Sequence, residues 1–202
     1  MDTPIVQMPG YRYAEYLLVL NPHEDLRNRI ITARGQFAEA FQLAHPVMGK
    51  PNITLARFTV WEMMEERIIH RLKVAAMGTA PFKVVLKDYG SFPSHTIFFQ
   101  VTTKAPVQML IKELKHAQRL MKSPEQDPHF IIEPYIALAR KLTSAQYDEA
   151  WKEYAHRQFT ASFIADAMLL LKRKQGQKGY QIIDRFEFMN LPVTTKQGQL
   201  FL

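Results

Sequence analysis

The chain has no cysteine among its 202 residues. Without thiols it has no disulfide framework, no thiol nucleophile and no cysteine-ligated zinc site. Long apolar runs are also missing: stretches such as residues 16–20 and 167–171 are far shorter than the roughly 18 residues that a bilayer span requires. The amino-terminal stretch lacks the hydrophobic region of a signal peptide. We therefore expect a cytoplasmic protein that does not enter a membrane.

Hydrophobic residues make up 47% of the chain, which is enough to bury a substantial core. We expect residues 1–202 to form one domain of two closely packed lobes. The net charge of +7 favours polyanionic partners, because clustered Lys and Arg release counterions when they meet phosphates. Basic residues gather at 112–122 and at 172–178. Each cluster could also be a solvated helix face or an exposed hairpin tip.

Strands and helices alternate along the chain without a regular βαβ repeat. Tyr-, Val- and Ile-rich runs predict strands, and apolar residues at helical spacing predict helices, the last of them with Ser144 as its N-cap. The predicted strands span residues 12–20, 53–60, 82–86, 96–101, 135–140, 163–171 and 180–188, and the predicted helices cover 26–41, 61–75, 107–121 and 144–154. Because short turns join neighbouring strands, we predict an α+β fold of mainly antiparallel sheet with flanking helices.

A short repeat links two of the predicted strands. Asn52-Ile-Thr-Leu-Ala-Arg and Tyr135-Ile-Ala-Leu-Ala-Arg share the frame x-Ile-x-Leu-Ala-Arg, and each copy follows a proline, Pro51 or Pro134. Each copy also precedes a predicted helix. The repeat indicates two related halves that contribute equivalent strands.

These two segments resemble the motif strands of the two-histidine phosphoesterases, the 2′-5′ RNA ligase-like superfamily. There, each lobe carries His-x-Thr or His-x-Ser, usually after a proline, in a strand that lines a central cleft. The resemblance extends through residues 81–93 and covers nearly the whole chain. It implies two pseudo-symmetric lobes and chemistry without a metal or other cofactor. One histidine would act as general base, the other as general acid, and the hydroxyls would hold the phosphate.

Both histidine positions are replaced in this chain. Strand alternation places Asn52 and Thr54 on one wall of the cleft and Tyr135 and Ala137 on the other. A carboxamide cannot exchange a proton near neutral pH, and a phenol with an ordinary pKa of about 10 rarely accepts one. Ala137 also lacks the phosphate-binding hydroxyl. We therefore expect no standard family catalysis, with a rate deficit of at least about 10³, and we expect Asn52, Thr54 and Tyr135 to bind the ligand.

Two other histidines could take over a catalytic role. His129 shares the strand parity of Tyr135 but lies about 20 Å upstream along an extended chain, so it reaches the cleft only if the loop folds back. His95 precedes a strand that the resemblance places beside the cleft, although it also fits an exposed turn. The histidines show no metal-site spacing.

Three functions remain open on these grounds. The first is a degenerate, monomeric family member that binds a nucleotide or an RNA end through phosphate. The second is a diverged enzyme in which Tyr135 serves as the acid. The third is a non-catalytic interaction protein that uses only its outer surface.

Overall fold

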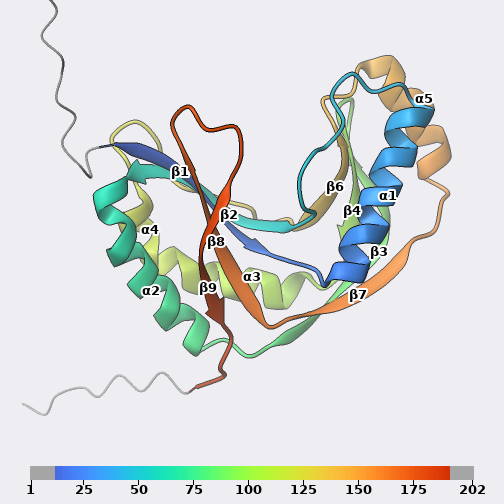
Figure 1. The fold of residues 1–202 in the computed structure, drawn as a ribbon. Coiled ribbons are helices and arrows are strands. Elements are labelled where there is room, and N and C mark those ends of the chain that lie inside the picture. The colour runs from blue at the N-terminus through green and yellow to red at the C-terminus, as the bar shows by residue number, and fades with distance from the viewer. Residues whose placement is uncertain (1–11, 192–202) are drawn as a thin grey trace, which may run out of the picture.

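Two antiparallel sheets form the framework of the structure, a computed structural model that describes residues 12–191 (Figure 1). The five-stranded sheet has the order β5-β2-β1-β8-β9 and the four-stranded sheet the order β6-β4-β3-β7. The first comprises β1 (Tyr13–Leu20), β2 (Ile53–Trp61), β5 (His129–Phe130), β8 (Ala167–Lys174) and β9 (Gln181–Glu187). The second comprises β3 (Phe82–Phe92), β4 (Thr96–Val101), β6 (Tyr135–Arg140) and β7 (Thr160–Ala165). The predicted α+β fold with antiparallel pairing is confirmed.

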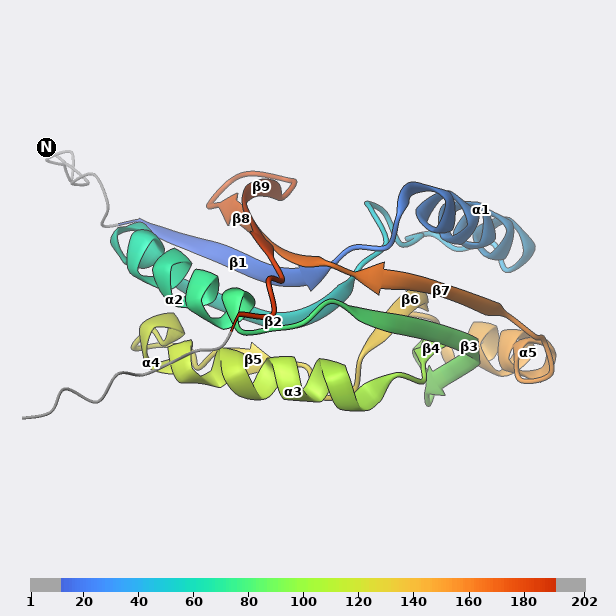
Figure 2. The same ribbon diagram turned by 90° about the horizontal axis from the view of Figure 1, so that it is seen from below.

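Within residues 12–191, helices cover one face of each sheet and leave the other face open (Figures 1 and 2). The five-stranded sheet packs against α2 (Glu65–Met77), α3 (Lys104–Leu114) and α4 (Gln118–Met121), whereas α1 (Glu24–Ala40) and α5 (Ser144–Tyr154) pack on the four-stranded sheet. The opposite face of each sheet carries the motif residues. None of the helices within residues 12–191 is long and apolar enough to cross a membrane.

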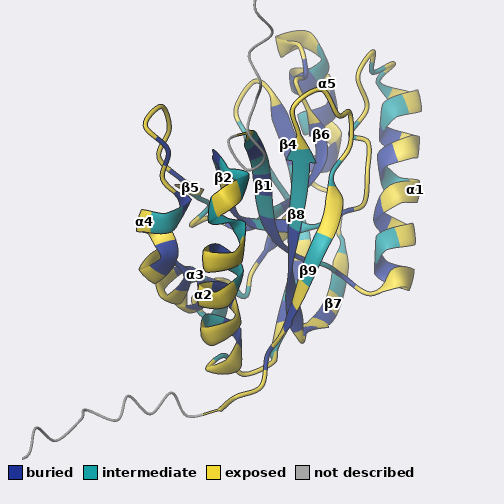
Figure 3. Ribbon diagram, turned by 60° about the vertical axis from the view of Figure 1, so that its left-hand side comes forward, coloured by how far each residue is buried: buried dark blue, intermediate teal, exposed yellow. Residues whose placement is uncertain are grey.

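The buried cores of the two lobes form one continuous cluster. Beneath the five-stranded sheet, the rings of Tyr16 and Phe58 stack with centroids 5.2 Å apart. In the other lobe, Phe37 of α1 meets Tyr154 of α5 at 5.0 Å. Figure 3 shows the buried residues concentrated on the sheets and on the inner faces of the helices, as the apolar periodicity predicted.

The predicted strand over residues 163–171 is wrong, because the chain forms two strands there, one in each sheet. β7 ends at Ala165, β8 begins at Ala167, and Asp166 lies between them. The Asp166 carbonyl accepts a hydrogen bond from the Phe188 amide at 2.8 Å, and its carboxylate pairs with Arg185 at 3.1 Å. Apolar residues continue on both sides of Asp166, so the pattern alone gave no sign of the crossing between sheets.

Three smaller predictions also need correction. The strand expected over residues 82–86 continues to Phe92. The helix expected over 107–121 is divided by a 3₁₀ turn at Lys115–Ala117, although its apolar stripe is buried as predicted. Helix α5 is capped by Thr143, which forms a capping box with Gln146, and not by Ser144.

Candidate functional site

The two repeated strands carry the same backbone irregularity. On β2, the residues on either side of Leu55 pair with successive residues of β1, so Leu55 is an extra residue in its strand. On β6, the residues on either side of Leu138 pair with successive residues of β4 in the same way. Each is a β-bulge at the leucine of the repeated frame. The relation between the two halves therefore extends to the backbone.

The bulges decide which way the frame arginines face. Side chains alternate between the faces of a strand, and an extra residue reverses the alternation beyond it. By strand register, Arg57 consequently shares the face of Thr54, and Arg140 shares the face of Ala137. Both arginines are exposed. Each motif strand thus directs an arginine to the open face of its own sheet.

On the first wall of the site, Asn52 and Thr54 are hydrogen bonded to each other. The Thr54 hydroxyl donates to Oδ1 of Asn52 at 3.2 Å, and Nδ2 of Asn52 donates to the Lys50 carbonyl at 3.1 Å. Asn21 follows Leu20, which pairs with Ile53 at the end of the β1–β2 register. Its buried Oδ1 has no hydrogen-bond partner within residues 12–191. This wall offers amide and hydroxyl groups, which bind polar ligands but do not exchange protons near neutral pH.

On the second wall, Tyr135 belongs to a group of rings from its own lobe. Its ring centroid lies 5.2 Å from that of Phe92, edge to face, and 5.0 Å from that of Phe98. The guanidinium carbon of Arg140 lies 5.6 Å from the Tyr135 ring centroid, a cation–π distance. The phenol is partly exposed. Tyr135 therefore stands between a cation and two phenylalanines.

A buried arginine joins the two motif segments. Arg34 of α1 is only 7% exposed. Its Nε donates to the carbonyl of Ala137 at 2.9 Å, and its Nη1 donates to the carbonyl of Gly49, in the loop before the first motif, at 3.1 Å. Burial, and then the charge of Arg140, lower the pKa of Arg34 to about 10, so the side chain is still a cation at neutral pH.

Arg34 and Arg140 give the second wall its positive charge. Within residues 12–191, no carboxylate forms an ion pair with Arg34 or Arg140. Arg57 on the first wall is different, because it pairs with Glu15, which also pairs with Arg173. Strands β2 and β6 contact each other where the lobes meet. The excess charge therefore lies at the second motif strand, where Arg34 contacts Ala137 and Arg140 contacts Tyr135.

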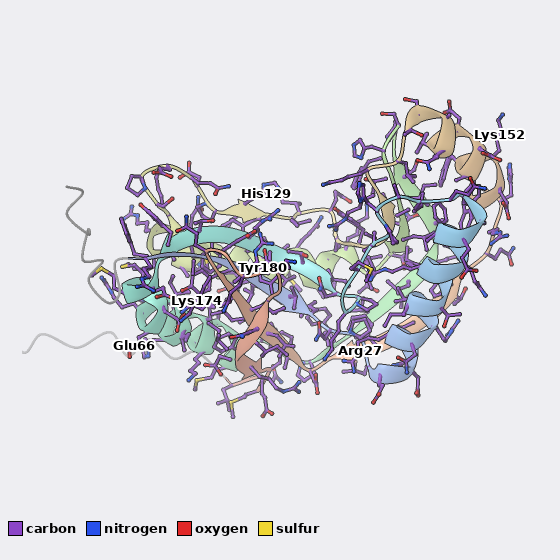
Figure 4. The ribbon with its side chains drawn as sticks, turned by 45° about the horizontal axis from the view of Figure 1, so that its top comes forward. Arg27, Glu66, His129, Lys152, Lys174 and Tyr180 are labelled. Atoms are coloured by element: carbon purple, nitrogen blue, oxygen red, sulfur yellow. The ribbon has the colours of Figure 1, made fainter. Side chains whose placement is uncertain are left out.

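Neither candidate histidine occupies a motif position. His129 forms the short strand β5, which was not predicted, and lies opposite Arg57 in the register. Figure 4 places it across β2 from Tyr180. His95 lies in the turn before β4, exposed, with Nδ1 2.7 Å from the Thr96 hydroxyl. In the described part of the chain, no group of His, Asp and Glu side chains is placed to hold a metal ion.

Three residues of this arrangement were not predicted from the sequence. Arg140 is visible in the repeated frame, but simple strand alternation assigns it to the wrong face because the bulge leaves no obvious mark in the sequence. Arg34 falls on the buried stripe of α1 between Ile30 and Phe37, and a charged residue there is a usable signal. Asn21 carried no signal beyond its place at the end of a strand.

Comparison with known proteins places the chain in a family. A family model described as the 2′-5′ RNA ligase superfamily matches residues 22–177. The structure of E. coli LigT complexed with 3′-AMP has a TM-score of 0.64 and 16% identity, over 88% of this chain and 98% of that chain. The structure of TT0787 from Thermus thermophilus has a TM-score of 0.61 and 18% identity, over 87% of this chain and 98% of that one.

No curated protein sequence matches the chain. At identities below one fifth, the two structural matches support the fold, whereas the family model matches most of the sequence itself. The chain belongs to the 2′-5′ RNA ligase superfamily.

Proposed function

We propose that the chain binds a phosphate-bearing ligand, a nucleotide or an RNA end, in the cleft between its lobes, and that it lacks the two-histidine catalysis implied by the family resemblance. One observation carries this proposal: Arg34 and Arg140 lie beside the second motif strand without an acidic partner among residues 12–191.

Uncompensated arginines favour an anion at this place for a simple physical reason. A buried guanidinium has lost hydration, and two nearby cations repel each other, so a phosphate placed between them relieves both costs. Arginine also binds phosphate through two parallel hydrogen bonds. Arg140 is free to turn toward a ligand because it is exposed. The Tyr135 hydroxyl supplies a further donor, and the Thr54 hydroxyl becomes another when it exchanges its hydrogen bond to Asn52 for one to the phosphate.

Related structures are consistent with this proposal. E. coli LigT has been solved in complexes with phosphate, with 3′-AMP and with ATP. We propose that the phosphate of the ligand lies between the two motif strands of this chain.

The absence of standard catalysis follows from the groups at the motif positions. Asn52 cannot act as a base, and its carbonyl oxygen already accepts a hydrogen bond from Thr54. Tyr135 can donate a proton, yet a general acid without a matching base loses much of the rate enhancement of the pair. We therefore propose a binding protein in preference to a diverged enzyme.

Calorimetric titration with inorganic phosphate and with ribose 5-phosphate tests the proposal. Arg140→Ala should weaken both ligands about tenfold or more, because a hydrogen bond to a charged group is typically worth roughly 1.5–3 kcal/mol. Arg119→Ala is the matched control, since Arg119 is an exposed arginine of α4 on the other side of the five-stranded sheet. Equal losses in the two variants, or no binding by the unmodified protein, would contradict the proposal.

A further inference from the structure

The basic cluster at residues 172–178 is largely neutralised by the chain itself. Lys172 pairs with two carboxylates, at 2.9 and 2.6 Å. Arg173 and Lys174 each pair with a carboxylate as well. An anionic partner would have to displace these contacts, so the fold accounts for most of the charge in this cluster.

The basic cluster at residues 112–122 differs in this respect. Lys112, Lys115 and Arg119 are exposed, and none of them pairs with a carboxylate in the described part of the chain. Their i, i+3, i+7 spacing keeps them on one side of the helical segment formed by α3, the 3₁₀ turn and α4. The charges of these three side chains are therefore available to a partner.

Helix α2 adds two arginines to the same surface. It lies alongside α3 and α4 and contacts both (Figure 2). One flank of α2 faces β9, where Lys73 pairs with Asp184 at 3.4 Å. At about 100° per residue, Arg67 and Arg71 lie roughly 120° and 160° from Lys73, on the flank turned toward α3 and α4. Both arginines are exposed, and neither has a carboxylate partner among residues 12–191.

The acidic residues of these helices do not balance this charge. Their exposed carboxylates are Glu66 and Glu113. By helical periodicity Glu66 lies on the flank of Lys73, away from the arginines, and Glu113 is 3.8 Å from His116. Five cations therefore form a surface that we call the helix-face patch: Arg67, Arg71, Lys112, Lys115 and Arg119.

The form of the patch indicates the kind of partner. Cations spread over the outer sides of two helices contribute little to the binding of one phosphate, but they contact several charges of a polyanion at once. A helix that binds a membrane inserts its apolar face, whereas Leu72 of α2 and Leu114 of α3 are fully buried in the core. Arginine forks also match the paired oxygens of a phosphodiester. These features favour a nucleic acid strand over a lipid surface.

We infer that the helix-face patch binds the phosphodiester backbone of an RNA strand. The patch lies on the side of the five-stranded sheet opposite to the motif residues, so this binding is independent of the cleft. The inference goes beyond the proposed function, because it concerns a separate surface and a polymer instead of a single phosphate group.

Fluorescence anisotropy of a labelled RNA of about 12 nucleotides without terminal phosphates, at about 50 to 200 mM NaCl, tests the inference. The double variant Arg71→Gln, Arg119→Gln should weaken binding about tenfold or more, because it removes two charged hydrogen-bond donors. It should also reduce the slope of log K against log salt concentration by roughly 1.4, since each phosphate neutralised on a single strand contributes about 0.7.

The matched control removes the same charge from the same helices at positions that are already paired. Lys73 and Lys104 form ion pairs with Asp184 and Glu133. The double variant Lys73→Gln, Lys104→Gln should therefore change the slope by less than half as much. Circular dichroism would verify that both double variants fold.

The outcomes keep this inference apart from the proposed function. Equal slope changes in the two double variants, or no RNA binding by the unmodified protein, would overturn the inference. Displacement of the RNA by polyglutamate or by anionic vesicles at equal charge would assign the patch to another polyanion and overturn it as well. Calorimetry with ribose 5-phosphate reports on the cleft alone: if RNA binds and ribose 5-phosphate does not, the proposed function fails while this inference stands.

Discussion

Leu55 on β2 and Leu138 on β6 hold the same position in two strands of different sheets, and each is the residue that its neighbouring strand leaves unpaired. The bulges turn Arg57 and Arg140 toward the open faces of the sheets. In both copies, the repeated sequence Ile-x-Leu-Ala-Arg therefore forms a strand in which a bulge at the leucine reverses the side-chain alternation. The two motif histidine positions fall at the other end of that frame, where the chain carries Asn52 and Tyr135.

Restoring the motif side chains should create activity. The triple variant Asn52→His, Tyr135→His, Ala137→Thr should hydrolyse a 2′,3′-cyclic nucleotide at a measurable rate, because general acid and base groups each contribute roughly 10² to 10⁴ to the rate. Chromatography of the products from 2′,3′-cyclic AMP would measure it. Asn52→His alone is the control, since it restores no histidine at the second motif position.

The unmodified protein should show no such hydrolysis. Robust turnover that disappears in Asn52→Ala and in Tyr135→Phe would mean that the present motif residues are catalytic, contrary to the proposed binding role.

The capping box of α5 provides a test of the fold. Thr143 accepts a hydrogen bond from the Gln146 amide, so Thr143→Ala should lower the free energy of unfolding by about 1 kcal/mol. Ser144→Ala is the matched control and should change it by less than about 0.5 kcal/mol, as an exposed substitution outside the cap. Urea denaturation measures both variants. A larger loss of stability for Ser144→Ala than for Thr143→Ala would indicate that Ser144 is the N-cap, as the sequence predicted, and would contradict the structure.

The free energy of unfolding should depend on pH through Glu15, which lies on the open face of the five-stranded sheet. Burial alone would raise the pKa of this carboxyl, but hydrogen bonds from Tyr180, Arg173 and Arg57 outweigh burial and hold the pKa below its ordinary value of 4.5. A lowered folded-state pKa means that the unfolded chain binds the proton more readily. This stabilisation is therefore present above pH 4.5 and is lost as the pH falls through the lowered value.

Glu15→Gln removes the titrating group, so the stability of this variant should change less with pH below about 4.5 than that of the unmodified protein. Thermal unfolding of both proteins at a series of acidic pH values would measure the difference. Parallel profiles would show that Glu15 does not contribute to the acid dependence.

The sequence predicted much of the fold because its signals were local and periodic. The apolar stripe of α1 follows from helical spacing, and the two motif strands follow from the repeated frame. Both are present in the structure, with the motif strands in different sheets. The crossing at Asp166 and the strand β5 were missed for a different reason. Each depends on which sheet a short segment joins, and tertiary pairing decides that, not the residues of the segment.

The site was predictable in part. Strand alternation placed Asn52 with Thr54, whose side chains are indeed hydrogen bonded. The alternation rule failed beyond the bulges, so Arg140 was not recognised. Arg34 lies more than 100 positions from its partner Ala137, and nothing local in the sequence indicates that contact.

A crystal structure grown in phosphate would show directly whether the motif strands bind an anion. We expect a phosphate ion between the motif strands, with Arg140 and the Thr54 hydroxyl among its donors and Tyr135 beside it. A cleft without phosphate at a saturating concentration, with the anion bound only at the basic β8–β9 hairpin, would contradict it.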